Sequence, residues 1–164
     1  MNYTKAFLLI VCAFFLTLLD ASFFSAMPLF GATILSSYIL ALALSISKEL
    51  NLLLCYVISA VFFFSIFSSL PIWLIVIVFL GVPYVIFYVR KKYFPKLSIL
   101  PSALFFITGT LIFSTIFLIY NKEWNLNGLI ILIYFILINS AIGVGVYYLL
   151  QKLEMDFGRK EIRF

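Results

Sequence analysis

Long apolar stretches constrain this chain more than any other feature of its sequence. Charged residues, prolines and polar clusters divide it into six such stretches, with 66% of all residues hydrophobic and only 10% charged. Soluble domains carry roughly 25% charged residues, and a core of this size could not cover so much apolar surface. About twenty apolar residues in a helix cross the hydrocarbon of a bilayer. The sequence therefore predicts an all-α, multi-pass integral membrane protein.

The six stretches predict a six-transmembrane-helix bundle in one domain. The predicted spans are residues 6–24, 29–47, 50–67, 72–89, 99–120 and 126–150, followed by a charged cytoplasmic tail at residues 151–164. Pro28 marks a first turn, where a tight helical hairpin is expected, and Ser68 to Pro71 mark a second. One alternative is that the first stretch is a cleaved signal peptide, although the small residues that precede a cleavage site are poorly placed.

Basic residues predict which side of the membrane each turn faces, because short loops rich in Lys and Arg stay in the cytoplasm. With six spans and the N-terminus inside, ten of the eleven basic residues fall on the inner side and only Lys122 falls outside. The inner residues are Lys5, Lys48, Arg90, Lys91, Lys92, Lys96, Lys152, Arg159, Lys160 and Arg163. We therefore expect both termini in the cytoplasm. The net charge of +5 belongs to these flanks, so nucleic acid is not an expected partner.

The sequence offers little for enzymatic chemistry. It has no His, and its six acids lie mostly at the ends of apolar stretches or in the tail. Asp20, the acid closest to mid-membrane, is expected to face water near the outer end of the first span or to pair with Lys122. Cys12 and Cys55 lie inside apolar stretches without metal-type spacing and are interpreted as packing residues. We therefore expect no catalytic residue, cofactor or metal, and no enzyme.

Two sets of residues are candidates for helix–helix interfaces. Ser37, Ala41 and Ser45 recur every four residues along the second span, and Asn139 lies near the middle of the sixth span, with Gly143 one turn later. Small residues let helices approach closely, and an amide in lipid needs a hydrogen-bond partner. Packing inside the bundle is the favoured interpretation of both sets, and contact with a partner protein is the alternative.

A basic cluster, Arg90, Lys91, Lys92 and Lys96, occupies the predicted inner loop between the fourth and fifth spans. A role in determining topology is sufficient to explain it. Attraction to anionic lipids or to an acidic partner at the cytoplasmic face is the alternative, so membrane lipids are one expected partner.

Two turn regions resemble those of the rod shape-determining protein MreD family. They read Phe24-Ser25-Ala26-Met27-Pro28-Leu29-Phe30-Gly31, similar to the Leu-Pro-Leu-Phe-Gly turn common in that family, and Ser68-Ser69-Leu70-Pro71, before a span ending in Arg90-Lys91-Lys92-Tyr93-Phe94. The chain departs from the family at Phe62-Phe63-Phe64, where an acidic residue is often seen. It also has Ala32-Thr33 in place of a Pro-Asp or Pro-Asn pair.

The resemblance implies a non-enzymatic scaffold subunit of the bacterial cell-elongation complex, in the inner (cytoplasmic) membrane, with a role in cell shape and peptidoglycan synthesis. It implies binding to an MreC-like protein and, through the complex, to MreB and the peptidoglycan glycosyltransferase and transpeptidase. It also implies a helical bundle similar to the S components of energy-coupling-factor transporters. A small-molecule transport component of that kind is the alternative hypothesis, which would require polar side chains around an outward-opening cavity.

Overall fold

A computed structural model describes residues 3–29, 31–46, 49–94, 99–121 and 125–161. The elements, with η for a π-helical segment, are α1 (Tyr3–Leu19), η1 (Asp20–Phe24), α2 (Ser36–Ile46), α3 (Leu50–Phe67), α4 (Ile72–Val76), η2 (Ile77–Gly81), α5 (Val82–Tyr93), α6 (Ile99–Asn121) and α7 (Leu126–Glu161). An isolated β-bridge joins Leu29 and Ala32. The described part of the chain is thus almost entirely helical.

Among the described residues, five helices are long and apolar enough to cross a membrane. They are Tyr3–Phe23, Leu50–Phe67, Ile72–Tyr93, Leu100–Tyr120 and Leu126–Lys152. The chain is therefore a multi-pass helical membrane protein, and five of the predicted spans correspond closely to these helices. The predicted charged tail differs in form, because α7 continues as a helix through Glu161.

The second predicted span, residues 29–47, is broken. Its helical part, α2, has 11 residues, which rise about 16 Å, roughly half of the hydrocarbon thickness. The described residues between 28 and 35 are not helical. Leu29 and Ala32 exchange backbone hydrogen bonds of 2.9 Å around Gly31, whose φ of +81° favours glycine. The prediction of a tight helical hairpin is therefore wrong at this point.

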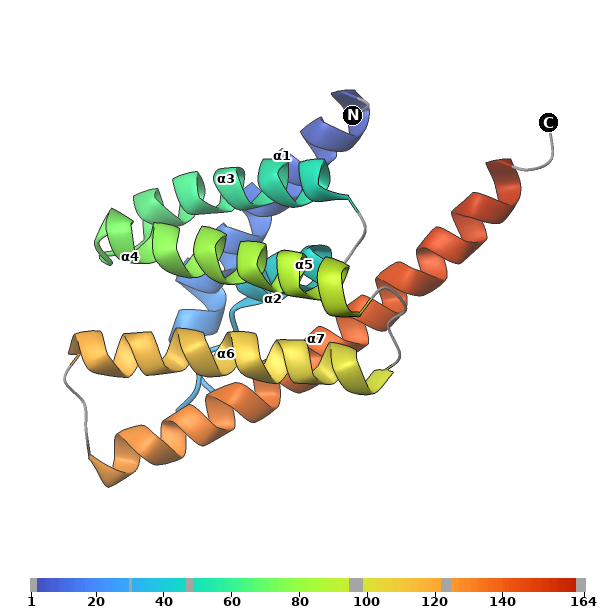
Figure 1. Cartoon of the computed structure of the whole chain (residues 1–164). Helices are drawn as coiled ribbons and strands as arrows, with labels where there is room; N and C mark the ends of the chain where they lie inside the picture. The colour runs from blue at the N-terminus through green and yellow to red at the C-terminus, as the bar shows by residue number, and fades with distance from the viewer. Residues whose placement is uncertain (1–2, 30, 47–48, 95–98, 122–124, 162–164) are drawn as a thin grey trace.

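Helix α2 nevertheless lies at the centre of the bundle. It contacts α1, α3, α5, α6 and α7, while α1 also packs against α3 and α6 against α7. In Figure 1, α3 runs beside α4 and α5, and α2 lies behind α5. Nine of the 11 residues of α2 are buried. The hydroxyl of Tyr38 donates to the Gly109 carbonyl at 2.9 Å, and that of Tyr56 donates to the Ser37 carbonyl at 2.9 Å.

The two ends of the bundle differ in character. The start of α1, the end of α5, the start of α6 and the end of α7 lie at one end (Figure 1), which we call the basic end because α5 finishes there with Arg90, Lys91 and Lys92. At the opposite end, which we call the turn end, η1 leads into the broken span and α3 leads through Ser68 to Pro71 into α4. The 36 residues of α7 rise about 54 Å, so this helix projects beyond the bundle.

The carboxylate of Asp20 holds the N-terminus of α2. One oxygen accepts from the Ser36 N–H at 2.8 Å and the Ser36 hydroxyl at 2.6 Å, and the other accepts from the Ser37 N–H at 2.9 Å and the Ser37 hydroxyl. Asp20 is only 4% exposed, so the expectation that it faces water is wrong. A negative charge at a helix N-terminus satisfies free N–H groups and is favoured by the helix dipole.

Asn139 of α7 holds the non-helical residues that precede α2. Its side-chain oxygen accepts from the Leu35 N–H at 2.9 Å, and its Nδ2 donates to the carbonyls of Thr33 at 3.1 Å and Phe135 at 2.9 Å. Lipid offers no hydrogen bonds, so irregular backbone at membrane depth needs such partners. Asp20 and Asn139 therefore supply, from two other helices, the hydrogen bonds that a continuous helix would make internally.

Gly143 permits close packing of α6 on α7. A Cβ at this position would lie closer than 3.0 Å to three atoms of the Phe106 ring, which is fully buried. Nearby, the hydroxyls of Thr110 and Ser140 lie 3.1 Å apart across the same two helices. Gly145, two residues further along α7, has no described heavy atom within 4 Å of such a Cβ. The two glycines therefore lie in different environments.

We expect Asp20→Ala to lower the free energy of unfolding by about 2–4 kcal/mol, because two amides and two hydroxyls lose their acceptor. Asp20→Asn keeps one acceptor oxygen, so its free energy of unfolding should lie between those of Asp20→Ala and the wild type. Reversible unfolding in mixed micelles measures both. Ser22→Ala is the control, since that exposed hydroxyl bonds only the carbonyl of its own helical turn. Equal stability of Asp20→Ala and Ser22→Ala would contradict the assigned role.

Gly143→Ala is expected to destabilise the protein by about 1–3 kcal/mol, because the added methyl group must displace the Phe106 ring. Gly145→Ala adds the same methyl group in open space and should be neutral or slightly stabilising. The difference in unfolding free energy between the two variants is the measurement. A destabilisation shared equally by both would show that helix packing at Gly143 is not the cause.

Candidate functional site

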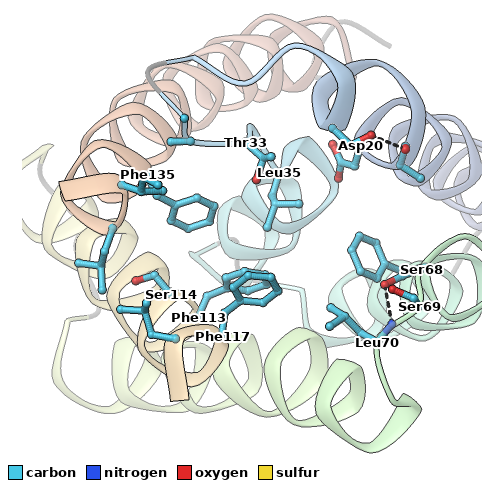
Figure 2. Close-up of a pocket in the computed structure, with 18 of the residues that line it drawn as sticks. Asp20, Thr33, Leu35, Ser68, Ser69, Leu70, Phe113, Ser114, Phe117 and Phe135 are labelled. Atoms are coloured by element: carbon cyan, nitrogen blue, oxygen red, sulfur yellow. Dashed lines mark hydrogen bonds between the residues drawn. The ribbon is translucent and has the colours of Figure 1, made fainter. Parts of the chain in front are cut away.

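A cavity of about 450 Å³ lies at the turn end, between η1, α3, α6 and α7. This volume is within the range of small-molecule sites. Figure 2 shows the helices arranged around the cavity, with Thr33 and Leu35 of the broken span on its wall. Its lining residues include Ser25 at the end of η1 and Gly31 and Ser69 in the turns at this end, and all three are exposed. The cavity therefore opens at the turn end.

Aromatic rings make up much of the cavity wall. Phe113 stacks on Phe117 and on Phe135, with ring centroids 6.4 and 5.5 Å apart and ring planes within 17° of parallel. These three rings join α6 to α7 on one side of the cavity (Figure 2). Helix α3 contributes Phe64 and Phe67. Such a wall favours an apolar occupant, because aromatic side chains bury large areas and stack specifically.

Several polar side chains around the cavity are bonded to the protein itself. Both oxygens of Asp20 hold the start of α2, and together they accept four hydrogen bonds, about as many as a carboxylate can accept. The Ser25 hydroxyl donates to the Ala21 carbonyl at 2.6 Å, and the Ser114 hydroxyl donates to the Leu111 carbonyl at 3.0 Å. Within the described residues, no three His, Cys, Asp or Glu side chains gather into a metal site.

The interface candidates predicted from sequence lie inside the bundle. Ser37, Ala41 and Ser45 are fully buried along α2, and the Ser45 hydroxyl donates to the Leu42 carbonyl at 2.6 Å. Asn139 is 1% exposed, and Gly143 is buried against Phe106. The structure therefore brings these residues to internal contacts. None of them lines the cavity at the turn end, whereas Asp20 does.

The predicted basic loop takes a different form from the one expected. Arg90, Lys91 and Lys92 belong to the last turn of α5, where basic side chains interact favourably with the helix dipole. Arg90 is buried, at 7% exposed, whereas Lys91 and Lys92 are exposed. The Lys92 ammonium lies 5.2 Å from the centroid of the Tyr93 ring. Lys96 lies outside the described residues.

Sequence reasoning missed the cavity and the role of Asp20. One signal was present, because an acid within an apolar stretch requires a partner, and Ser36 and Ser37 begin the next helical segment. The aromatic wall had no such signal, since its five phenylalanines come from three separate helices in a chain that contains 20 of them.

Two features of the structure are candidates for function. The candidate features are the cavity at the turn end and the exposed faces of the long helices. No protein-family model, curated protein or solved structure matches this chain.

Proposed function

We propose that the protein is a non-enzymatic membrane scaffold subunit of the MreD type, acting in the bacterial cell-elongation complex and in cell shape and peptidoglycan synthesis. It binds an MreC-like partner and, through the complex, MreB and the peptidoglycan glycosyltransferase and transpeptidase. Support comes from the resemblance of the two turn regions. Further support is that Asp20 and Asn139, two buried groups that could serve a reaction or an ion path, are bonded to the backbone of the chain itself.

The observation that carries this proposal is an exposed face of α7. Tyr134, Leu137, Ala141, Gly145 and Tyr148, spaced three or four residues apart, are all exposed, and we call them the α7 outer face. A Cβ at Gly145 would meet no described heavy atom within 4 Å. Ala141 and Gly145 form the small-xxx-small pattern that lets a second transmembrane helix approach closely, and flanking tyrosines add area. This face fits a helix of the partner.

We propose that the protein lies in the inner membrane, crosses it six times and has both termini in the cytoplasm. The exposed Lys91 and Lys92 at the basic end agree with the retention of basic residues inside. Helix α1 starts and helix α7 ends at that same end (Figure 1), as an even number of crossings requires. In this topology α2 and the non-helical residues before it make the second crossing together.

A second candidate function, a small-molecule transport component resembling an S component, is favoured by the cavity. The cavity opens at the turn end, which the proposed topology places outside the cytoplasm. Its polar groups are mostly engaged with the protein, whereas a polar substrate would need several that are available. The scaffold function is therefore the first proposal.

Gly145→Leu is expected to reduce co-purification of the MreC-like partner from mild detergent at least about tenfold, because the larger side chain keeps the partner helix away from α7. Gly81→Leu is the matched control. That glycine also has no described heavy atom near a Cβ, and it lies on η2, away from the α7 outer face. Full recovery of the partner with Gly145→Leu, in a protein that remains folded, would exclude this face as the interface.

Cysteine labelling in intact cells tests the topology. In a background with Cys12 and Cys55 replaced by serine, Ser69→Cys at the turn end should react with a membrane-impermeant maleimide. Lys91→Cys at the basic end should react only after the cells are permeabilised. Both positions are exposed, so accessibility to the reagent depends on the side of the membrane. Labelling of Lys91→Cys from outside would reverse the proposed orientation.

A further inference from the structure

The charges around the cavity at the turn end select against ions. Among its described lining residues none is Lys or Arg, so a phosphate, carboxylate or sulfonate would find no cation there. The one carboxylate, that of Asp20, has both oxygens engaged by Ser36 and Ser37 at the positive end of the α2 dipole. It has little capacity left to accept a hydrogen bond from a cation. A neutral ligand is therefore the one that fits.

The hydroxyl groups of Ser114 and Ser25 in the wall favour a ligand that carries a hydrogen-bond donor. The hydrogen of the Ser114 hydroxyl is donated to the Leu111 carbonyl, and that of Ser25 to the Ala21 carbonyl. Each oxygen keeps acceptor capacity, so these groups present acceptors to the cavity. A ligand that bonds them must bring its own donor, a hydroxyl or an N–H. Ser114 also lies next to Phe113, so a donor there would sit at the edge of the aromatic wall.

We propose that the cavity binds a neutral small molecule with an apolar ring system and a hydrogen-bond donor at its edge. The ring system lies against Phe113, Phe117 and Phe135, and the donor bonds the Ser114 oxygen. The molecule enters from the turn end, where the lining residues Ser25, Gly31 and Ser69 are exposed. This inference deepens the second candidate function and does not depend on partner binding at the α7 outer face.

Three probes with one ring system separate the requirements for charge and for a donor. They are 2-naphthol, which is neutral and carries a hydroxyl donor; 2-methoxynaphthalene, which is neutral and carries none; and naphthalene-2-sulfonate, which is an anion. Binding is measured by equilibrium dialysis against the full chain in lipid nanodiscs, with uptake by empty nanodiscs subtracted. We expect 2-naphthol to bind about three- to tenfold more tightly than 2-methoxynaphthalene, and the sulfonate not to bind.

Two pairs of variants locate the site. Leu132→Trp fills part of the cavity and should weaken 2-naphthol binding at least about tenfold, whereas Leu129→Trp, on the exposed side of the same helix, should change it less than about twofold. Ser114→Ala should weaken 2-naphthol about three- to tenfold and leave 2-methoxynaphthalene unchanged. Its control is Thr115→Val, because the Thr115 hydroxyl also donates to the Leu111 carbonyl but lies outside the cavity lining.

Binding of 2-naphthol no greater than that of empty nanodiscs would overturn the proposal, as would tighter binding of the sulfonate. Equal weakening by Leu132→Trp and Leu129→Trp would place the probe elsewhere on the protein. Thermal unfolding of each variant in the same nanodiscs excludes misfolding as the cause. Co-purification of the MreC-like partner should be unaffected by Leu132→Trp, so failure of this proposal and failure of the scaffold proposal give different results.

Discussion

The whole bundle depends on hydrogen bonds made to the broken second span. A continuous transmembrane helix satisfies its own backbone, and water is absent from the hydrocarbon. Before α2, Leu29 and Ala32 pair with each other, but Thr33 and Leu35 depend on the side chain of Asn139. Asp20 and Asn139 complete this span from two other helices. Because α2 is the element that contacts α3, α5, α6 and α7, the core of the protein is built around a helix whose start is held from outside itself.

This use of polar groups also determines where function can lie. A carboxylate and an amide inside a membrane are candidates for ion or substrate binding by default. Here both are engaged by backbone groups, and the broken span that they hold contributes Thr33 and Leu35 to the cavity wall. The available features are therefore an aromatic cavity with acceptor oxygens and an exposed helix face.

The long helices could be predicted from sequence because helix formation in lipid is local: a sufficient apolar length satisfies its own backbone. The break after Pro28 could not be predicted, because residues 29–46 are uncharged and mostly apolar. The groups that stabilise the break lie 16 residues before Ser36 and 104 residues after Leu35. The sequence predicts that the Asn139 amide needs a hydrogen-bond partner, but it does not predict that this partner is the backbone of Thr33 and Leu35. The cavity likewise depends on how η1, the broken span, α3, α6 and α7 meet, which no local pattern specifies.

The bond between Asn139 and Leu35 has a consequence for the order of membrane insertion. Asp20 is synthesised before Ser36 and Ser37, so the first pair of segments can enter the membrane with the carboxylate already engaged. The partner of the Leu35 amide and the Thr33 carbonyl is synthesised much later, because Asn139 follows Leu35 by 104 residues. The broken second span is therefore completed only when α7 inserts, so α3, α4, α5 and α6 enter the membrane before Leu35 and Thr33 gain their side-chain partner.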